Sequence, residues 1–174
     1  MKSGRPEAGE FAPYAQSDID YVAGDDAVRA LRDQEQVVLD LFGAFTDDSA
    51  NGLTYAPGKW TLKEVLGHLI DDERIFAYRA LCVARGDATP LPGFDENEYM
   101  VDANFESRPL ASLLAEYRSV RQASITLFDS LSDSASVRRG TVNGYSASPR
   151  GLAFHVAGHE LHHLRTLREK YLRK

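Results

Sequence analysis

Hydrophobic residues recur every three or four positions in four long stretches of this chain, and no stretch alternates apolar and polar residues clearly enough to predict a strand. This spacing places the apolar side chains on one face of a helix. Four amphipathic helices are therefore expected, at about residues 25–45, 61–85, 109–131 and 149–172. In one small domain they favour an all-α, antiparallel four-helix bundle, because each helix can bury its apolar stripe against the others.

Local signals mark the ends of these helices. Thr61 is followed three residues later by Glu64, the spacing of a capping box, and Gly86 marks the end of the second helix. Pro109 and Pro149 are well placed in first turns, where the missing N–H of proline costs little. These positions set the limits of the second, third and fourth helices in the prediction.

The segments between the helices are predicted to be loops. Residues 86–107 form a long connection that crosses one end of the bundle, with a short helix expected after Phe94. The last connection contains Asn143 and Gly144, and a short extended pair is expected around them. Residues 1–20 are expected to be a partly irregular leader of a single domain that spans residues 1–174.

Composition narrows the class of protein. The chain has 174 residues, of which 43% are hydrophobic, and this suits one globular domain with a core. Its formal charge of −6 and its pI near 5.3 argue against nucleic-acid binding, which relies on a basic surface.

Neither a membrane nor an oxidising compartment is expected. No apolar run approaches the roughly 20 residues that a membrane-spanning helix needs, and the N-terminus lacks the hydrophobic core of a secretory signal. The single cysteine, Cys82, cannot form an internal disulfide and is expected to be a small packing residue. A cytoplasmic protein is therefore predicted.

Four of the five histidines lie in the last predicted helix, in the sequence LAFHVAGHELHHLRTL. On a helical wheel with His155 at zero, the apolar residues of this helix occupy an arc from about 100° to about 260°. His159 falls at about 40° and His163 at about 80°, near the edge of the arc. His155 and His162 lie further toward the polar side and are expected on the surface. The i, i+4 spacing of His159 and His163 allows both imidazoles to chelate one ion.

His68, the fifth histidine, lies at the margin of the apolar stripe of the second helix. A bundle can bring it against His159 and His163, and three neutral imidazoles with an open fourth position suit zinc, nickel or iron. The alternative is a set of polar residues on a helical scaffold, because histidines near a helix C-terminus also oppose the helix dipole. Trp60, just before the second helix, is expected to be a core anchor or a pocket wall.

Three charged residues, Glu73, Arg121 and Glu160, project into the apolar arcs of their predicted helices. Because a lone buried charge is very costly, they are expected to meet one another or a ligand. A buried ion network that fixes the register of the bundle is the favoured interpretation, and orientation of the imidazoles is the alternative. Asp72, four residues after His68, is a candidate metal ligand or general base.

Four stretches together resemble the DinB-like superfamily, which includes YfiT-type hydrolases and bacillithiol transferases. They are APGKWTLKEVLGHLIDDERIFAYRAL, LPGFDENEY, EYRSVRQASITLFDSL and AGHELHHL, in matching order. The resemblance implies an up-down-down-up four-helix bundle with a long crossover loop, often a homodimer, that binds a divalent metal ion. The family's histidine on the second helix falls on His68, and its terminal HxxxH pair falls on His159 and His163.

The resemblance also implies a function, a thiol S-transferase or a hydrolase that acts on a small molecule. In this hypothesis His68, His159 and His163 hold the metal ion, Asp72 or Glu160 assists proton transfer, and a low-molecular-weight thiol is the expected partner. The alternative is a non-catalytic bundle stabilised by metal, either stress-related or a dimerisation module. A three-histidine set favours the enzyme, because incomplete protein coordination is usual at catalytic sites and unusual at structural ones.

Overall fold

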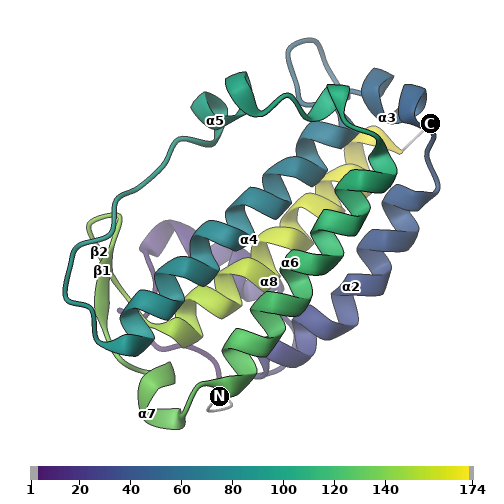
Figure 1. Cartoon of the computed structure of the whole chain (residues 1–174). Coiled ribbons are helices and arrows are strands. Elements are labelled where there is room, and N and C mark those ends of the chain that lie inside the picture. The colour runs from purple at the N-terminus through teal and green to yellow at the C-terminus, as the bar shows by residue number, and fades with distance from the viewer. Residues whose placement is uncertain (1–3, 173–174) are drawn as a thin grey trace.

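The computed structural model of the chain describes residues 4–172, in which four long helices form an up-down-down-up bundle (Figure 1). Two of the long helices run in one direction and two in the other, which confirms the all-α bundle and the topology that the family resemblance implies. The long helices are α2 (Ala27–Gly43), α4 (Leu62–Arg85), α6 (Leu110–Ser130) and α8 (Pro149–Thr166), with α8 continuing into a π-helical turn, η3 (Leu167–Tyr171). Short helices in the predicted loops are α3 (Asp47–Gly52) and α7 (Asp133–Ser136).

The predicted signals account for most of the helix ends. Thr61 and Glu64 form both hydrogen bonds of a capping box, and the Thr61 backbone N–H donates to the Glu64 carboxylate over 2.7 Å. Gly86 ends α4 in the left-handed conformation, with a φ of 82°. Pro149 lies in the first turn of α8, as predicted. Pro109 instead precedes α6, because its extended backbone, with a ψ of 135°, starts the helix one residue later.

The long crossover joins the C-terminal end of α4 to the N-terminal end of α6, so these two helices run parallel (Figure 1). It contains the short helix predicted after Phe94, which is α5 (Glu96–Ala103), and a 3-10 turn, η2 (Phe105–Ser107). The Phe105 ring is buried where a Cβ at Gly67 of α4 would stand. This contact holds the end of the crossover against α4.

The connection before α8 forms the extended pair that the sequence predicts. Strands β1 (Gly140–Val142) and β2 (Tyr145–Ala147) are antiparallel. Both turn residues have positive φ, 51° for Asn143 and 78° for Gly144, as a type I′ hairpin turn requires. Leu91 of the crossover forms an isolated bridge to β1, so the hairpin and the crossover are joined.

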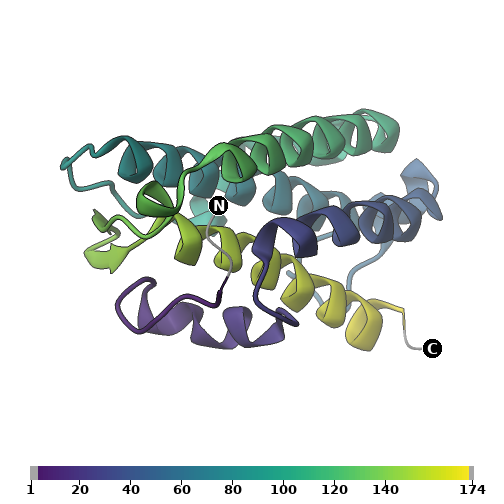
Figure 2. The ribbon, with the colours of Figure 1, turned by 90° about the horizontal axis from the view of Figure 1, so that it is seen from below.

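The N-terminal segment is more regular than the leader that the sequence predicts. It contains a 3-10 turn, η1 (Pro13–Ala15), and a helix, α1 (Gln16–Tyr21), that lies along α8 (Figure 2). This close approach depends on Gly158 of α8, because a Cβ there would clash with the backbone carbonyl oxygen of Asp18. Helix α1 has only 6 residues, too few for hydrophobic periodicity to distinguish it from a loop.

A buried ion network lies between two hydrophobic clusters, one toward each end of the bundle. The first cluster includes Leu31, Phe76 and Phe154, and the second includes Phe42, Leu66 and Leu113. Arg121 Nη2 donates to Glu73 Oε2 over 2.9 Å and to Glu160 Oε2 over 2.6 Å. The Tyr117 hydroxyl also donates to Glu160 over 2.8 Å, and Arg121 Nη1 donates to the Leu31 carbonyl oxygen over 3.0 Å. The network predicted from the inward charges is confirmed, and it joins all four long helices.

Cys82 lies on the flank of α4, where its free thiol is partly buried against the first cluster. This position agrees with the predicted packing role. Among the helices of residues 4–172, none combines the length and the apolar character that crossing a membrane requires.

Candidate metal centre

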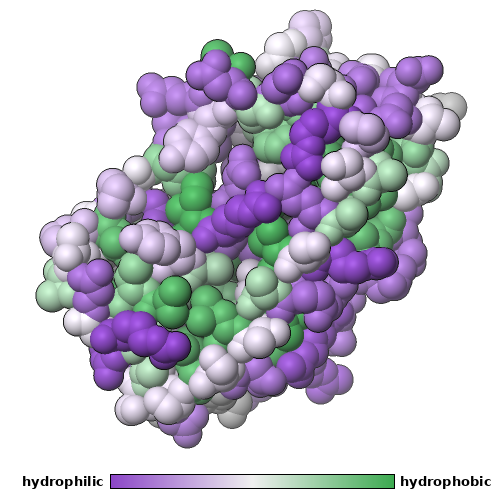
Figure 3. All heavy atoms as spheres, in the orientation of Figure 1, coloured by the Kyte–Doolittle hydropathy of each residue, from purple (hydrophilic) through white to green (hydrophobic). Residues whose placement is uncertain are grey.

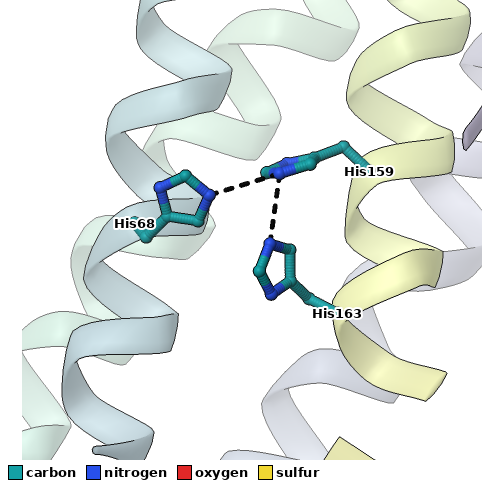
Figure 4. Close-up of side chains that lie close together, drawn as sticks. All are labelled: His68, His159 and His163. Atoms are coloured by element: carbon teal, nitrogen blue, oxygen red, sulfur yellow. Dashed lines mark hydrogen bonds between the residues drawn. The ribbon is translucent and has the colours of Figure 1, made fainter. Parts of the chain in front are cut away.

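His68, His159 and His163 converge between α4 and α8 (Figure 4). His159 and His163 are one turn apart on α8, and His68 approaches them from α4. The Nε2 atom of His159 lies 3.2 Å from that of His68 and 3.1 Å from that of His163. The three imidazoles therefore present one nitrogen each to a common point.

The spacing of these nitrogens fits a single divalent metal ion. Zinc binds histidine nitrogens at about 2.0–2.1 Å, so tetrahedral geometry places two such nitrogens about 3.3 Å apart. The observed separations of 3.1 and 3.2 Å from His159 Nε2 are close to that value. Three imidazole nitrogens also suit nickel and iron, so the donor set does not select one metal.

The carboxylate of Asp72 faces the opposite edge of the His159 ring. Asp72 Oδ2 lies 3.3 Å from His159 Nδ1, and Asp72 is only 4% exposed. A carboxylate in this position favours a proton on Nδ1, which leaves the lone pair of Nε2 directed at the other two histidines. The sequence suggests two roles for Asp72, metal ligand and general base. The contact does not support direct ligation, because the carboxylate faces Nδ1 of His159 and the converging nitrogens are Nε2 atoms.

Burial and neighbouring charges shift the pKa values of these groups in opposite directions. Burial lowers the pKa of His68 to about 4, and it lowers the pKa of His163 well below the ordinary value. Burial also acts to lower the pKa of His159, but the facing Asp72 carboxylate outweighs it and the pKa is raised. For Asp72, burial acts to raise the pKa, but the facing histidines outweigh it and the pKa is lowered. His68 and His163 are therefore neutral at pH 7, the form that binds metal.

Two clefts open beside the converging nitrogens. The larger has a volume of about 480 Å³, is lined by His68, His159 and His163, and lies between α4, α8, the crossover and the N-terminal segment. The smaller has a volume of about 290 Å³ and lies beside the C-terminal part of α8. Trp60, His162 and His163 line both clefts. Figure 3 shows the surface hollowed between the crossover and α4.

Trp60 contacts both His68 and the hydrophobic core. Its ring centroid lies 4.8 Å from that of His68. The same side chain packs against the second hydrophobic cluster and lines both clefts. The two roles expected for Trp60, core anchor and pocket wall, are therefore filled together.

The prediction that His155 lies on the surface is wrong. His155 is 6% exposed and stacks on Phe76, with ring centroids 4.0 Å apart. The N-terminal segment covers the side of α8 that the helical wheel left to solvent. His155 Nε2 lies 3.9 Å from Asp72 Oδ2, and its buried Nδ1 has no hydrogen-bond partner within residues 4–172. His162 is exposed, as predicted, with its Nδ1 3.6 Å from Asp18.

Glu160 lies in the ion network of the core. Arg121 donates to both of its oxygens, and Tyr117 donates to one of them. Glu160 is 2% exposed and is not among the described residues that line the two clefts. The structure therefore brings Asp72, but not Glu160, to the cleft beside the three histidines.

Sequence reasoning assigned no site role to Tyr14, Asp18, Arg79 or Asn143, and all four line the larger cleft. Tyr14 and Asp18 belong to the N-terminal segment, and no sequence signal indicated that this segment packs on α8. The position of Arg79 could have been predicted from the sequence. Arg79 follows His68 by eleven residues, which is about three helical turns, so both lie on the same face of α4.

The family model of the DinB superfamily matches residues 27–167. The chain belongs to the DinB superfamily. The matched region contains the three converging histidines and all four long helices of this DinB-superfamily chain. A search of curated protein sequences found no match.

Two solved structures share the fold. YfiT from Bacillus subtilis, described as a probable metal-dependent hydrolase with an unusual four-helix bundle topology, has a TM-score of 0.74 and 17% identity, over 95% of this chain and 91% of YfiT. The mycothiol-dependent maleylpyruvate isomerase has a TM-score of 0.65 and 12% identity, over 79% of this chain. The alignment spans 58% of the isomerase chain. These likenesses confirm the fold of this chain, and the activities named are those of the two other proteins.

Proposed function

We propose that this protein is a metal-dependent enzyme acting on a small molecule, with His68, His159 and His163 as the metal ligands. The observation that carries the proposal is the convergence of three Nε2 atoms in the wall of a cleft of about 480 Å³. Three protein ligands leave a coordination position open, which is usual at catalytic metal sites. The descriptions of the two structural neighbours, one metal-dependent and one mycothiol-dependent, support the same class of function.

The proposed reaction is a thiol S-transfer or a hydrolysis. Zinc, nickel or iron at this site would lower the pKa of a coordinated thiol or water and make a nucleophile available at neutral pH. The protein contributes neutral His68 and His163 side chains and a cleft that holds a small substrate beside them. The expected partner is a low-molecular-weight thiol, and the protein is expected to act in the cytoplasm.

In this proposal Asp72 orients His159 by holding the proton on Nδ1. Asp72 also lines the larger cleft, so it remains a candidate to accept a proton from the substrate. Glu160 is assigned to the ion network instead of to proton transfer, because Arg121 and Tyr117 occupy its oxygens.

Metal content and thiol binding test the proposal. Protein purified without a histidine tag should contain about one divalent ion per chain, and His68→Ala and His163→Ala should each lose it. The matched control is His162→Ala, because His162 is exposed and adjacent to His163, and this variant should keep the metal. Absence of stoichiometric metal after reconstitution of the wild-type protein would refute the proposal.

Spectroscopy and a substrate screen then separate catalysis from structural metal binding. The visible spectrum of the cobalt-substituted protein should change when a small thiol is added, because a new ligand alters the coordination of the ion. Small thiols with electrophiles, and small esters and amides, would identify transfer or hydrolysis. A melting temperature that falls on metal removal, together with no effect of any thiol on the cobalt spectrum, would favour the non-catalytic bundle.

The homodimer implied by the family resemblance is also a proposal. An apolar groove lies between α4 and α6 and includes Tyr78, Leu81 and Leu127. Tyr78 is 60% exposed and Leu81 is 36% exposed, so the groove presents adjacent large hydrophobic side chains to solvent. This groove is the surface that supports self-association through α4 and α6.

A further inference from the structure

Arg79 is a buried cation in the wall of the larger cleft. It lies on α4 and is only 4% exposed. Its Nη2 donates a hydrogen bond of 2.6 Å to the carbonyl oxygen of Pro92 on the crossover. Within residues 4–172, no carboxylate forms an ion pair with this guanidinium. A buried charge without a counter-charge is costly, so its presence calls for a physical reason.

The other buried cations of the described chain all have a counter-charge. Lys63, Arg121 and Arg150 are each at most 4% exposed, and each lies within 2.9 Å of a carboxylate oxygen. Arg79 is buried to the same extent and differs from them in lacking this partner. What distinguishes Arg79 is that it faces a cleft large enough for a small molecule.

Aromatic rings hold the Arg79 guanidinium in one place. Its Cζ atom lies 4.8 Å from the ring centroid of Phe76 on α4 and 5.5 Å from that of Phe94 on the crossover. With one Nη donating to Pro92, other N–H groups of the fork remain available for a planar acceptor. Burial lowers the pKa of Arg79, but a guanidinium keeps its proton at pH 7. The group is a preorganised site for an anion.

Two of the three acids that line the same cleft lie beside histidines. Asp72 faces His159 at 3.3 Å, and Asp18 lies 3.6 Å from His162. Glu96 also lines the cleft, as the first residue of the exposed helix α5. None of these carboxylates forms an ion pair with Arg79, and only the charge of Asp72 acts on it from a distance. The N–H groups of the guanidinium are therefore not occupied by a carboxylate.

The separation between Arg79 and the metal centre follows from the helix that carries both. Arg79 is eleven residues after His68, a rise of about 16 Å along α4. A long side chain on a helix leans toward the N-terminus, and the contact with Phe76 agrees with this direction. His68 leans in the same direction, so most of the rise remains and the guanidinium is on the order of 15 Å from the converging nitrogens.

We propose that Arg79 binds a carboxylate of the substrate while the reactive group of the same molecule lies at His68, His159 and His163. The inference rests on the proposed function and narrows its substrate class. Of the separation between Arg79 and the histidines, a hydrogen bond takes about 3 Å and a metal–ligand bond about 2 Å. The substrate is therefore a small anionic molecule whose carboxylate is separated from its thiol or other reactive group by about 10 Å. Arg79 acts as a binding residue, and it selects substrates by charge and length.

Octanoate binding to the metal-free protein tests the role of Arg79 without the metal. Trp60 is the single tryptophan of the chain and lines the cleft, so its fluorescence reports occupancy. Wild-type protein should bind octanoate about ten- to a hundredfold more tightly than octanol, because only the carboxylate accepts charge-assisted hydrogen bonds. Arg79→Gln should lose this preference, and Arg79→Lys should keep part of it.

Two controls make the result specific. Arg85→Gln removes the same charge from an exposed position on the same helix and should leave the preference unchanged. Lys170→Gln removes a cation from the smaller cleft and should also leave it unchanged. Equal binding of octanoate and octanol to the wild-type protein would overturn the inference, even if Arg79→Gln failed to fold. A preference lost in Lys170→Gln but kept in Arg79→Gln would overturn it as well.

The cobalt-substituted protein separates this inference from the proposed function. There, 8-mercaptooctanoate should change the cobalt spectrum at a concentration about ten- to a hundredfold lower than 8-mercaptooctanol does. If no thiol changes the spectrum but the metal-free protein prefers octanoate through Arg79, the proposed function fails and the anion site stands. If both thiols change the spectrum at equal concentrations, the proposed function stands and the role of Arg79 fails.

Discussion

Replacing Asp72 by asparagine tests how the protein prepares His159 to bind metal. Asparagine keeps nearly the same shape but removes the negative charge that faces His159 Nδ1 at 3.3 Å. It can also present its amide nitrogen to the ring, which would favour the tautomer with the proton on Nε2. The Asp72→Asn variant should therefore bind divalent metal more weakly than the wild-type protein.

The size of the loss follows from the burial of the pair. Asp72 is 4% exposed, so solvent screens its charge only weakly. Changes of this kind typically reduce metal affinity by about 10- to 100-fold, or about 1.4–2.7 kcal/mol. The loss should shrink as the pH falls from about 7.5 to about 6. Asp72 raises the pKa of His159, so at lower pH a proton competes with the metal for His159 in the wild-type protein. This competition is weaker in Asp72→Asn, so the two affinities become more similar.

Competition with a chromogenic chelator measures both effects. Asp71→Asn is the matched control, because Asp71 is the adjacent residue and its carboxylate lies 3.7 Å from Arg74 instead of facing a histidine. Equal metal affinity in Asp72→Asn and wild-type protein, or an equal loss in Asp71→Asn, would refute the orienting role. If Asp72→Asn kept its metal affinity but lost turnover, Asp72 would instead be assigned as the general base.

Four further perturbations test the fold and the assembly. In metal-free protein, the free energy of unfolding should decrease from about pH 6.5 to about pH 4 in urea titrations, because burial lowers the pKa of His68 and His155 to about 4 and the unfolded chain takes up these protons first. Arg121→Met should destabilise the protein by about 3–5 kcal/mol in chemical denaturation, since two carboxylates lose their shared partner. Gly158→Ala should cost about 1–3 kcal/mol and make the N-terminal segment more sensitive to protease, because α1 must shift. Leu81→Glu should convert the proposed dimer to a monomer in light scattering, and an unchanged mass would exclude this groove as the interface.

The sequence was informative wherever a long helix set the direction of a side chain. Helices α4 and α8 have 24 and 18 residues, enough for the 3.6-residue period to assign an inward face to each. His159 and His163 lay at the edge of one apolar arc and His68 at the margin of the other. Two such faces packed against each other bring these side chains together, and the structure does so.

The same method failed at His155, because a helical wheel assigns faces without knowing what covers them. The side of α8 that carries few apolar residues is covered by the N-terminal segment. That contact joins positions more than a hundred residues apart. It requires the absence of a side chain at Gly158, beside Asp18, and at Gly151, beside Glu10. A helix as short as α1 provides no periodicity from which such packing can be predicted.

One face of α4 shows why the cleft has its present form. His68, Asp72, Phe76 and Arg79 follow one another at spacings of four, four and three residues, so they occupy a single line along the helix. In an ordinary bundle this line would be apolar and would meet the equivalent line of α8. Helices α4 and α8 pack closely, but along this line the polar groups face a cleft that the crossover and the N-terminal segment help to enclose. The proposed metal ligand His68 and the proposed anion-binding residue Arg79 therefore lie on one rigid helix, which fixes their separation.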